Sequence, residues 1–364
     1  MSKIVSWDIS RISVPLITPF ITSVRRCDAT DGAALKLYTD DGVCGYGEAS
    51  ATMRVAGEDF DSIVSALDKY ILPAIKGKDV FDKNAAANAI RSSCVKNTSA
   101  KAAAEIAYYD LYARMLGMPL YRLLGRSDAG DVCTDITVSL DDPEKMVSDS
   151  VSALKAGFTS LKIKLGRSPR EDAERVFRIR EAVGENVTLR ADANQGWTVK
   201  EAVKIIRELE KGGAGLELVE QPCDFLDIDG LERITGSVET PILADECVYS
   251  PRDCTEIIKR HAADMINIKL MKTGGITDAV TIIEICRCCG VKVMMGSMLE
   301  NPISITAAAH IAHANPDVVT AIDLDAPFLC KNDGSFDRFY RSGTVFASGK
   351  IALSDEAGIG ILLK

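Results

Sequence analysis

The chain has 364 residues, of which 47% are hydrophobic and 26% charged, and its formal net charge is −9. This composition allows a large buried core, and the negative charge argues against nucleic acid and anionic membrane surfaces as partners. No apolar run reaches membrane-spanning length, and the N-terminal segment lacks the features of a signal peptide. We therefore expect a soluble cytoplasmic protein.

The first 125 residues predict an α+β domain. Residues 1–50 alternate like strands, in KIVSWDISRISVPL and GAALKLYTDDGVCGYGEA, and the Asp-Asp-Gly at 40–42 is a hairpin signal. Residues 58–125 have helical patterns, such as SAKAAAEIAYYDLYARMLG. Strands followed by a run of helices are typical of an α+β domain.

From residue 126 to about 339 the pattern alternates between strands and helices. Eight short apolar runs recur, separated by helical patterns: CTDITVSL, TSLKIKL, NVTLRAD, GLELVEQP, PILADE, ADMINIKL, VKVMMGS and VVTAIDLD. Eight strands over roughly 200 residues favour an α/β fold of the (β/α)8 type, a modified TIM barrel. A Rossmann fold would need a GxGxxG motif after an early strand, and the sequence has none.

Polar residues follow nearly every predicted strand, at the end where such barrels build their active sites. They are Lys162 and Lys164, Asp192 with Asn194, Glu220, Asp245 with Glu246, Lys269, the loop GSMLE, and Asp323 with Asp325. Any one of these residues could simply begin a solvated loop. Three acids on consecutive strands, flanked by lysines, favour a functional site instead.

Asp192, Glu220 and Asp245 are the predicted metal ligands. Three convergent carboxylates need a cation between them if all are to stay ionised. Hard oxygen ligands suit Mg²⁺, with Mn²⁺ as the alternative.

Lys164 and Lys269 are the predicted catalytic bases. They follow the second and sixth strands, which lie on opposite sides of an eight-stranded barrel, so each can serve one face of a carbon atom. Lys162 and the metal would then stabilise the developing enolate and lower the pKa of the bases.

These residues resemble those of the enolase superfamily, muconate-lactonizing subgroup, whose members use a lysine or histidine base with Mg²⁺. The motifs are LKIKLG, RADANQGW, ELVEQP, LADE, NIKLMKTGGI and GSMLE. The resemblance covers the whole chain. It implies a capping domain over residues 1–125, completed by C-terminal residues from about 340 to 364, and a catalytic barrel over residues 126–339.

Within the subgroup, AIDLDAP is similar to the dipeptide epimerases, in which Asp323 and Asp325 would bind the α-ammonium of the substrate. This resemblance implies 1,1-proton transfer at the α-carbon of the C-terminal residue of L-Ala-Xaa dipeptides, through an enediolate. Arg25 lies where the Ala-Glu members carry an arginine for the distal carboxylate of glutamate. The alternative for Arg25 is an ordinary surface arginine.

Thr137, Ser297 and Met298 are further candidates for contact with the dipeptide. Other readings stay open: o-succinylbenzoate synthesis, muconate cycloisomerisation, N-acylamino acid racemisation, or a non-catalytic binding protein on the same barrel. A thiol-redox role is a third class, but the eleven cysteines contain no CxxC and we expect most of them to be buried. The sequence is compatible with a monomer and with a homo-oligomer.

Overall fold

A computed structural model describes residues 2–331, 336 and 339–364. The N-terminal part begins with an antiparallel sheet of β1 (Ile4–Ile21), β2 (Arg26–Thr39) and β3 (Cys44–Ser50), in the order β1-β2-β3. The expected hairpin lies between β2 and β3, where Gly42 takes a φ of +85°. Its lack of a Cβ permits this left-handed conformation.

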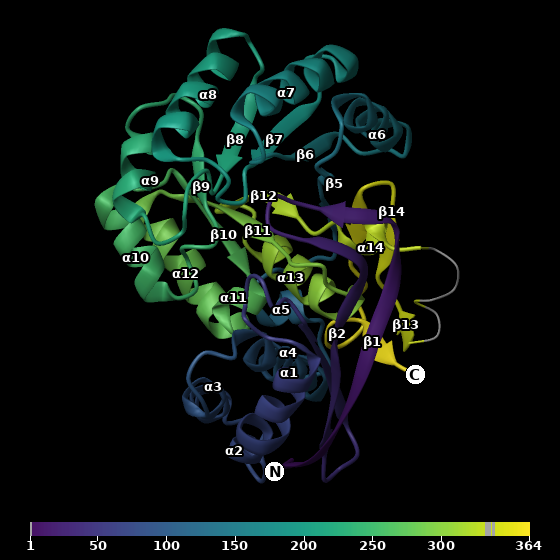
Figure 1. The fold of residues 1–364 in the computed structure, drawn as a ribbon. Helices are drawn as coiled ribbons and strands as arrows, with labels where there is room; N and C mark the ends of the chain where they lie inside the picture. The colour runs from purple at the N-terminus through teal and green to yellow at the C-terminus, as the bar shows by residue number, and fades with distance from the viewer. Residues whose placement is uncertain (1, 332–335, 337–338) are drawn as a thin grey trace.

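Helices cover one side of this sheet, as Figure 1 shows. They are α1 (Phe60–Ala66), the π-helical turn η1 (Leu67–Ile71), α2 (Leu72–Ile75), α3 (Lys83–Ser92), α4 (Thr98–Met115) and α5 (Leu120–Leu123). The buried helix α4 packs against β3. A Cβ at Gly45 or Gly47 would lie 2.2 Å or 2.0 Å from a backbone oxygen of α4, so only glycine permits this close packing.

Eight parallel strands form the second part, and the predicted barrel is confirmed. In sheet order from one edge to the other they run β12-β11-β10-β9-β8-β7-β6-β5. Their bounds are β5 (Ile136–Val138), β6 (Ser160–Lys164), β7 (Thr188–Asp192), β8 (Leu216–Glu220), β9 (Ile242–Ala244), β10 (Met265–Lys269), β11 (Lys292–Gly296) and β12 (Val319–Asp323). The two edges meet where the Asp135 amide donates to the Ile322 carbonyl at 3.3 Å.

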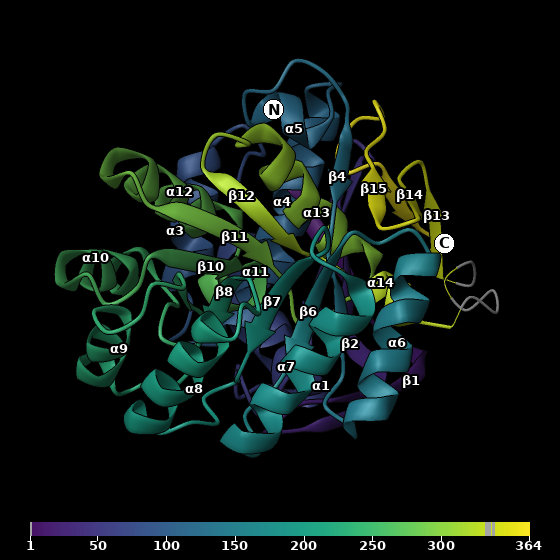
Figure 2. The same ribbon diagram turned by 90° about the horizontal axis from the view of Figure 1, so that it is seen from above.

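Helices follow the strands and lie around the outside of the barrel, as seen from above in Figure 2. They are α6 (Pro143–Lys155), α7 (Pro169–Val183), α8 (Val199–Lys211), α9 (Ile228–Thr235), α10 (Pro251–Arg260), α11 (Leu270–Thr273), α12 (Ile276–Cys289) and α13 (Pro302–Ala314). The longer helices turn their apolar residues toward the strands. The barrel strands are therefore buried on both faces, as is usual for a parallel sheet.

The C-terminal segment returns to the N-terminal part of the molecule, near β1 in Figure 1. It comprises α14 (Ala326–Leu329), β13 (Tyr340–Ser342), β14 (Val345–Ala347), β15 (Lys350–Ala352) and β16 (Ile361–Leu363). Strand β15 pairs with β4 (Asp131–Cys133). The Leu120 amide donates to Gly358, and the Ile359 amide to Asp110. These contacts join the segment to the N-terminal helices, but where the domains divide along the chain stays a prediction.

The expectation that most cysteines are buried is wrong. Only Cys223, Cys254, Cys286 and Cys330 of the eleven are buried, and all eleven are free thiols. On helix α12 the run CRCC places Cys286 inside, whereas Cys288 and Cys289, two and three positions later, are exposed. No helix in the described part of the chain combines the length and apolarity needed to cross a bilayer.

Candidate active site

The carboxyl ends of the barrel strands bring the predicted site residues together. A cavity of about 40 Å³ is lined by ten of the twelve: Arg25, Thr137, Lys162, Lys164, Asp245, Lys269, Ser297, Met298, Asp323 and Asp325. The other two, Asp192 and Glu220, are fully buried and contact lysines of this cavity. Residues that are as much as 300 positions apart in the sequence therefore form one enclosed polar site.

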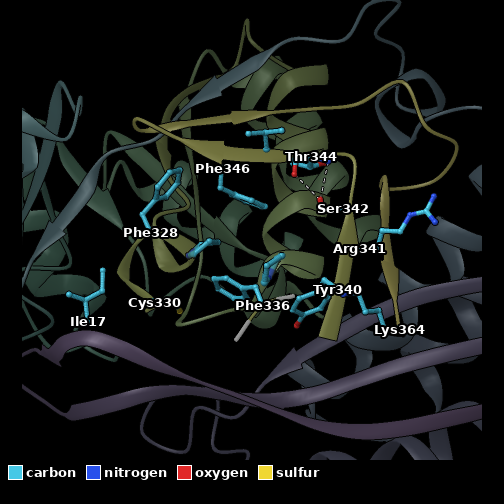
Figure 3. A pocket seen from close by; sticks show the side chains of 13 residues that line it. Ile17, Phe328, Cys330, Phe336, Tyr340, Arg341, Ser342, Thr344, Phe346 and Lys364 are labelled. Atoms are coloured by element: carbon cyan, nitrogen blue, oxygen red, sulfur yellow. Dashed lines mark hydrogen bonds between the residues drawn. The ribbon is translucent and has the colours of Figure 1, made fainter. Parts of the chain in front are cut away.

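A larger cavity, of about 720 Å³, lies elsewhere and is drawn in Figure 3. Aromatic side chains from the C-terminal segment, including Phe328, Tyr340 and Phe346, gather around it. None of the predicted site residues lines it. Its size alone gives it no chemistry, and the smaller cavity is the better candidate for a catalytic site.

Lys162 and Lys164 point into the barrel from β6, because residues two apart in a strand share a face. Lys164 pairs in register with Asp192, and its Nζ lies 2.6 Å from that carboxylate. The Lys162 ammonium lies 2.6 Å from Glu220 and 2.7 Å from Asp323. It also lies 3.3 Å from Asp192. Lys162 therefore links the ends of β7 and β8 to the end of β12.

Lys269 approaches from the other side of the barrel, since β10 stands four places from β6 in the sheet order. Its Nζ lies 2.7 Å from Asp245 Oδ2 and 3.8 Å from Glu220 Oε1. Lys164 and Lys269 thus face one cavity from opposite walls.

In the structure, which holds no metal ion, buried acids govern the pKa of Lys162 and Lys269. Burial lowers the pKa of Lys269, but Asp245 and Glu220 outweigh burial and raise it above its usual value. Burial also lowers the pKa of Lys162, but the surrounding acids, of which Asp323 has the largest effect, raise it above its usual value. A buried ammonium beside a carboxylate keeps its proton. Lys269 becomes a base only when another cation takes up the charge of these acids.

Asp192, Glu220 and Asp245 form a donor set that suits such a cation. Neighbouring strands present them side by side, with Asp192 opposite Glu220 in register. Glu220 Oε2 and Asp245 Oδ1 are buried, and each lies 2.6 Å from a lysine ammonium group, of Lys162 and Lys272 respectively. Burial, followed by Asp192, raises the pKa of Glu220 to about 8. Three carboxylates supply the hard oxygen donors that Mg²⁺ prefers.

Residues behind this donor set were missing from the sequence prediction. Asn267 donates from Nδ2 to Glu220 Oε1 at 2.9 Å, and the fully buried Lys272 lies 2.6 Å from Asp245 Oδ1. The Asp245 amide donates to Gln221 Oε1 at 2.9 Å. Asn267 precedes Lys269 by two strand positions, so strand periodicity could have identified it. Lys272 lies in the short helix α11 and gave no such signal.

A second acidic group includes Asp135, which the sequence analysis did not predict, and its carboxylates lie close together. Among the described residues, oxygen atoms of Asp135, Asp323 and Asp325 all lie within 4.8 Å of one another. Arg190 donates to Asp135 at 2.8 Å, and Lys162 to Asp323 at 2.7 Å. Fixed cations therefore already offset much of this charge. The group offers acceptors for one further ammonium rather than a vacant set of metal ligands.

Asp323 and Asp325 do not share a strand face as expected. Strand β12 ends at Asp323, and Asp325 is the N-cap of α14, whose Pro327 favours the start of a helix. Both side chains nevertheless line the cavity. Asp325 accepts a hydrogen bond from the Thr137 amide at 2.6 Å, and burial with Asp323 raises its pKa to about 6.

Ser297 and Met298 follow β11 and close the same side of the cavity. The Ser297 hydroxyl donates to the Asp323 carbonyl at 3.3 Å, and the Met298 amide donates to Glu300 at 2.8 Å. The buried Glu300 therefore fixes the loop that carries both residues.

Arg25 reaches the cavity from the loop between β1 and β2. The loop is tight, since the Arg25 amide donates to Thr22 Oγ1 at 3.2 Å, and Ser23 anchors it by donating to the Asn194 carbonyl at 3.1 Å. The guanidinium is half-buried, lies 5.9 Å from the Phe20 ring and forms no ion pair with any described residue. Burial lowers its pKa. An anionic ligand would complete its contacts.

Fold and site together define a class of protein: a capped (β/α)8-barrel enzyme with opposed lysines beside buried carboxylates. Residues 7–125 match the model of the mandelate racemase/muconate lactonizing enzyme N-terminal domain, and residues 145–364 match the enolase C-terminal domain-like model. The chain belongs to this mandelate racemase/muconate lactonizing enzyme family, as the sequence motifs predicted.

Individual relatives are similar over almost their full length. The chain is 44% identical to the L-Ala-D/L-Glu epimerase of Clostridium acetobutylicum over 353 residues, which cover 97% of each protein. A structure of the L-Ala-D/L-Glu epimerase from Bacillus subtilis in complex with substrate is 42% identical, with a TM-score of 0.95 and coverage of 100% and 99%. A dipeptide epimerase from Enterococcus faecalis complexed with Mg and L-Leu-L-Tyr is 37% identical, with a TM-score of 0.93 and 99% coverage of both chains.

Proposed function

We propose that this protein is a metal-dependent epimerase that inverts the α-carbon of the C-terminal residue of L-Ala-Xaa dipeptides, with glutamate as Xaa. The observation that carries the proposal is the pair of lysines, Lys164 and Lys269, on opposite walls of one enclosed cavity. The similarity to relatives named L-Ala-D/L-Glu epimerase, at 42–44% identity, supports the same reaction.

The two lysines divide the proton transfer between the two faces of the α-carbon. One takes the proton from its face, which generates an enediolate, and the other, protonated, returns a proton to the opposite face. Lys162 is near enough to the buried acids to stay charged and stabilises the negative oxygens that develop. Mg²⁺, or Mn²⁺ in its place, held by Asp192, Glu220 and Asp245, supplies positive charge for the substrate carboxylate.

The other cavity residues position the dipeptide. Asp323 and Asp325 accept from its α-ammonium, and Arg25 donates to the side-chain carboxylate of its C-terminal residue in a charge-assisted contact. Thr137, Ser297 and Met298 form the wall around the N-terminal alanine. The cavity measures about 40 Å³, so a dipeptide enters only when side chains of its wall move.

The alternative reactions have weaker support. A muconate lactonizing enzyme is 27% identical and an N-succinyl-L-Arg/Lys racemase 32% identical, whereas the epimerases reach 44%. A non-catalytic binding protein would not need two buried lysines paired with acids.

Eleven free thiols support a cytoplasmic location.

The test is deuterium exchange in D₂O. Protein with Mg²⁺ is incubated with L-Ala-L-Glu and a panel of other L-Ala-Xaa dipeptides, and α-deuteration is followed by NMR. We expect both epimers of the Ala-Glu dipeptide to appear with deuterium at the glutamyl α-carbon. Absence of α-deuteration in every dipeptide would contradict the proposal.

A further inference from the structure

A second cavity, of about 360 Å³, adjoins the candidate active site. It shares Val55 and Glu246 with the cavity that holds the lysines, so these two residues form the neck between them. Arg25 lines the inner cavity together with Glu246. The volume of the second cavity is in the usual range of ligand pockets, and the proposed reaction does not use this cavity.

The neck carries an acceptor without a donor. Glu246 is 5% exposed, and its Oε2 accepts no hydrogen bond in the structure. Its other oxygen only accepts from Asn194 Nδ2 at 3.4 Å. A buried carboxylate oxygen without a donor is costly, so a ligand N–H at this point would be favoured.

The outer end of the cavity carries two cations. Arg54 and Lys96 line it, and both are exposed side chains that form no ion pair or hydrogen bond with any part of the chain that the structure describes. They belong to two different loops of the N-terminal domain. An anionic group between them would gain charge-assisted contacts from both sides.

Two hydrogen bonds fix the walls of the cavity, one between the barrel and the N-terminal part and one between two barrel loops. Tyr249, after β9, donates to the Val55 carbonyl at 2.8 Å, and the Phe225 amide donates to Gln195 Oε1 at 3.2 Å. The cavity is therefore built from barrel loops on one side and from capping loops on the other.

We propose that this second cavity binds a carboxylate-bearing extension of the substrate, so that the enzyme also epimerises isopeptides in which the glutamate side-chain carboxyl is amide-linked to a further amino acid. The inference rests on the proposed function. Arg25 donates to the linking carbonyl, Glu246 accepts from the linking amide N–H, and the terminal carboxylate lies between Arg54 and Lys96. One added residue extends the substrate by roughly 3.6 Å, enough to pass a neck formed by single side chains.

The experiment compares three substrates in D₂O with Mg²⁺: L-Ala-L-Glu, the same dipeptide with glycine on its side-chain carboxyl, and the glycinamide analogue. We expect kcat/KM for α-deuteration of the glycine adduct to be within tenfold of the dipeptide value. The glycinamide analogue, which lacks the terminal charge, should be at least fivefold worse than the glycine adduct.

The double variant Arg54→Gln, Lys96→Gln should lower kcat/KM for the glycine adduct at least tenfold and leave L-Ala-L-Glu within twofold. Lys204→Gln, an exposed substitution on α8, is the control and should change neither value. Equal rates for the glycine and glycinamide compounds, or a double variant that behaves like the control, would overturn the inference. Exchange of the dipeptide without exchange of the glycine adduct would overturn this inference alone, whereas no exchange of any compound would overturn the proposed function.

Discussion

At the scale of single residues, the reaction depends on two lysines with different partners. Lys164 pairs with Asp192 and Lys269 with Asp245, so each base is held on its own wall by a different acid. The same two acids are proposed to hold the metal. The charge of the acids therefore decides whether a lysine can act as a base.

Lys164→Ala and Lys269→Ala should each lower epimerisation of L-Ala-L-Glu by about 10²- to 10⁴-fold, since each removes the acid–base group of one face. Each variant can retain exchange of the one enantiomer that the remaining lysine serves. Chiral analysis of the product and NMR in D₂O measure the two effects separately. Wild-type epimerisation in both directions by either variant would contradict the two-base assignment.

Glu220→Gln should abolish binding of Mn²⁺, followed by the electron paramagnetic resonance of the free ion, because it removes one of three proposed ligands. Asp135→Asn should retain binding, because Asp135 is paired with Arg190 rather than offered to a metal. If Asp135→Asn alone lost Mn²⁺ binding, the metal site would instead be the acidic group of Asp135, Asp323 and Asp325.

Arg25→Met should raise KM for L-Ala-L-Glu at least tenfold, because the lost guanidinium made the charge-assisted contact with the side-chain carboxylate. For L-Ala-L-Met, which carries no such charge, KM should change less than threefold. Initial rates by polarimetry give both values. A similar change in KM for the two dipeptides would argue that Arg25 acts as an ordinary surface arginine.

At the scale of elements, one buried acid of an N-terminal helix binds the start of a barrel helix. Glu105 of α4 accepts from the Thr277 amide, in the first turn of α12, at 2.8 Å. Gly275 precedes this helix with a φ of +127°, and a Cβ there would lie 2.4 Å from Glu105. This contact fixes α4 against α12.

Glu105→Ala should lower the free energy of unfolding by about 2 kcal/mol, because it leaves a buried amide without an acceptor. Glu105→Gln keeps an oxygen acceptor and should recover about half of this loss. Urea unfolding followed by circular dichroism measures both. Glu208→Ala, at an exposed position of α8, is the control, and an equal loss there would remove the capping explanation.

At the scale of the whole molecule, one histidine joins three distant parts of the chain. His310 of α13 accepts from the Tyr121 amide through Nδ1 at 3.1 Å, and its Nε2 faces the Ile359 carbonyl at 3.3 Å. Because Nδ1 is an acceptor, the neutral ring carries its proton on Nε2. Burial lowers the pKa of His310 to about 4.

Since the folded pKa of His310 is below its unfolded value of about 6.5, the unfolded chain binds more protons between these values. The stability it contributes is complete above pH 6.5 and is lost as pH falls toward 4. The wild type should lose about 3 kcal/mol more than His310→Gln between pH 7 and pH 4, by urea unfolding at each pH. An equal loss of stability in His310→Gln and the wild type would contradict the assignment to His310.

Sequence patterns were sufficient for the strands and for the positions at their ends. The recurrence of short apolar runs located all eight barrel strands, and parallel strands that end in polar residues carry these residues to one edge. Asn267 followed the same rule and could have been included. Lys272 could not, because its importance depends on which acid its side chain contacts.

The sequence by itself determined the barrel, the lysine pair and the three proposed metal ligands, because strand periodicity and strand order are local properties that repeat along the chain. Only the tertiary structure decided that Arg25 lacks an ionic partner among the described residues, that Asp135 joins Asp323 and Asp325, and that a second cavity lies beside Glu246. These features depend on distances between segments far apart in the sequence, and on the charges that each segment brings to the others.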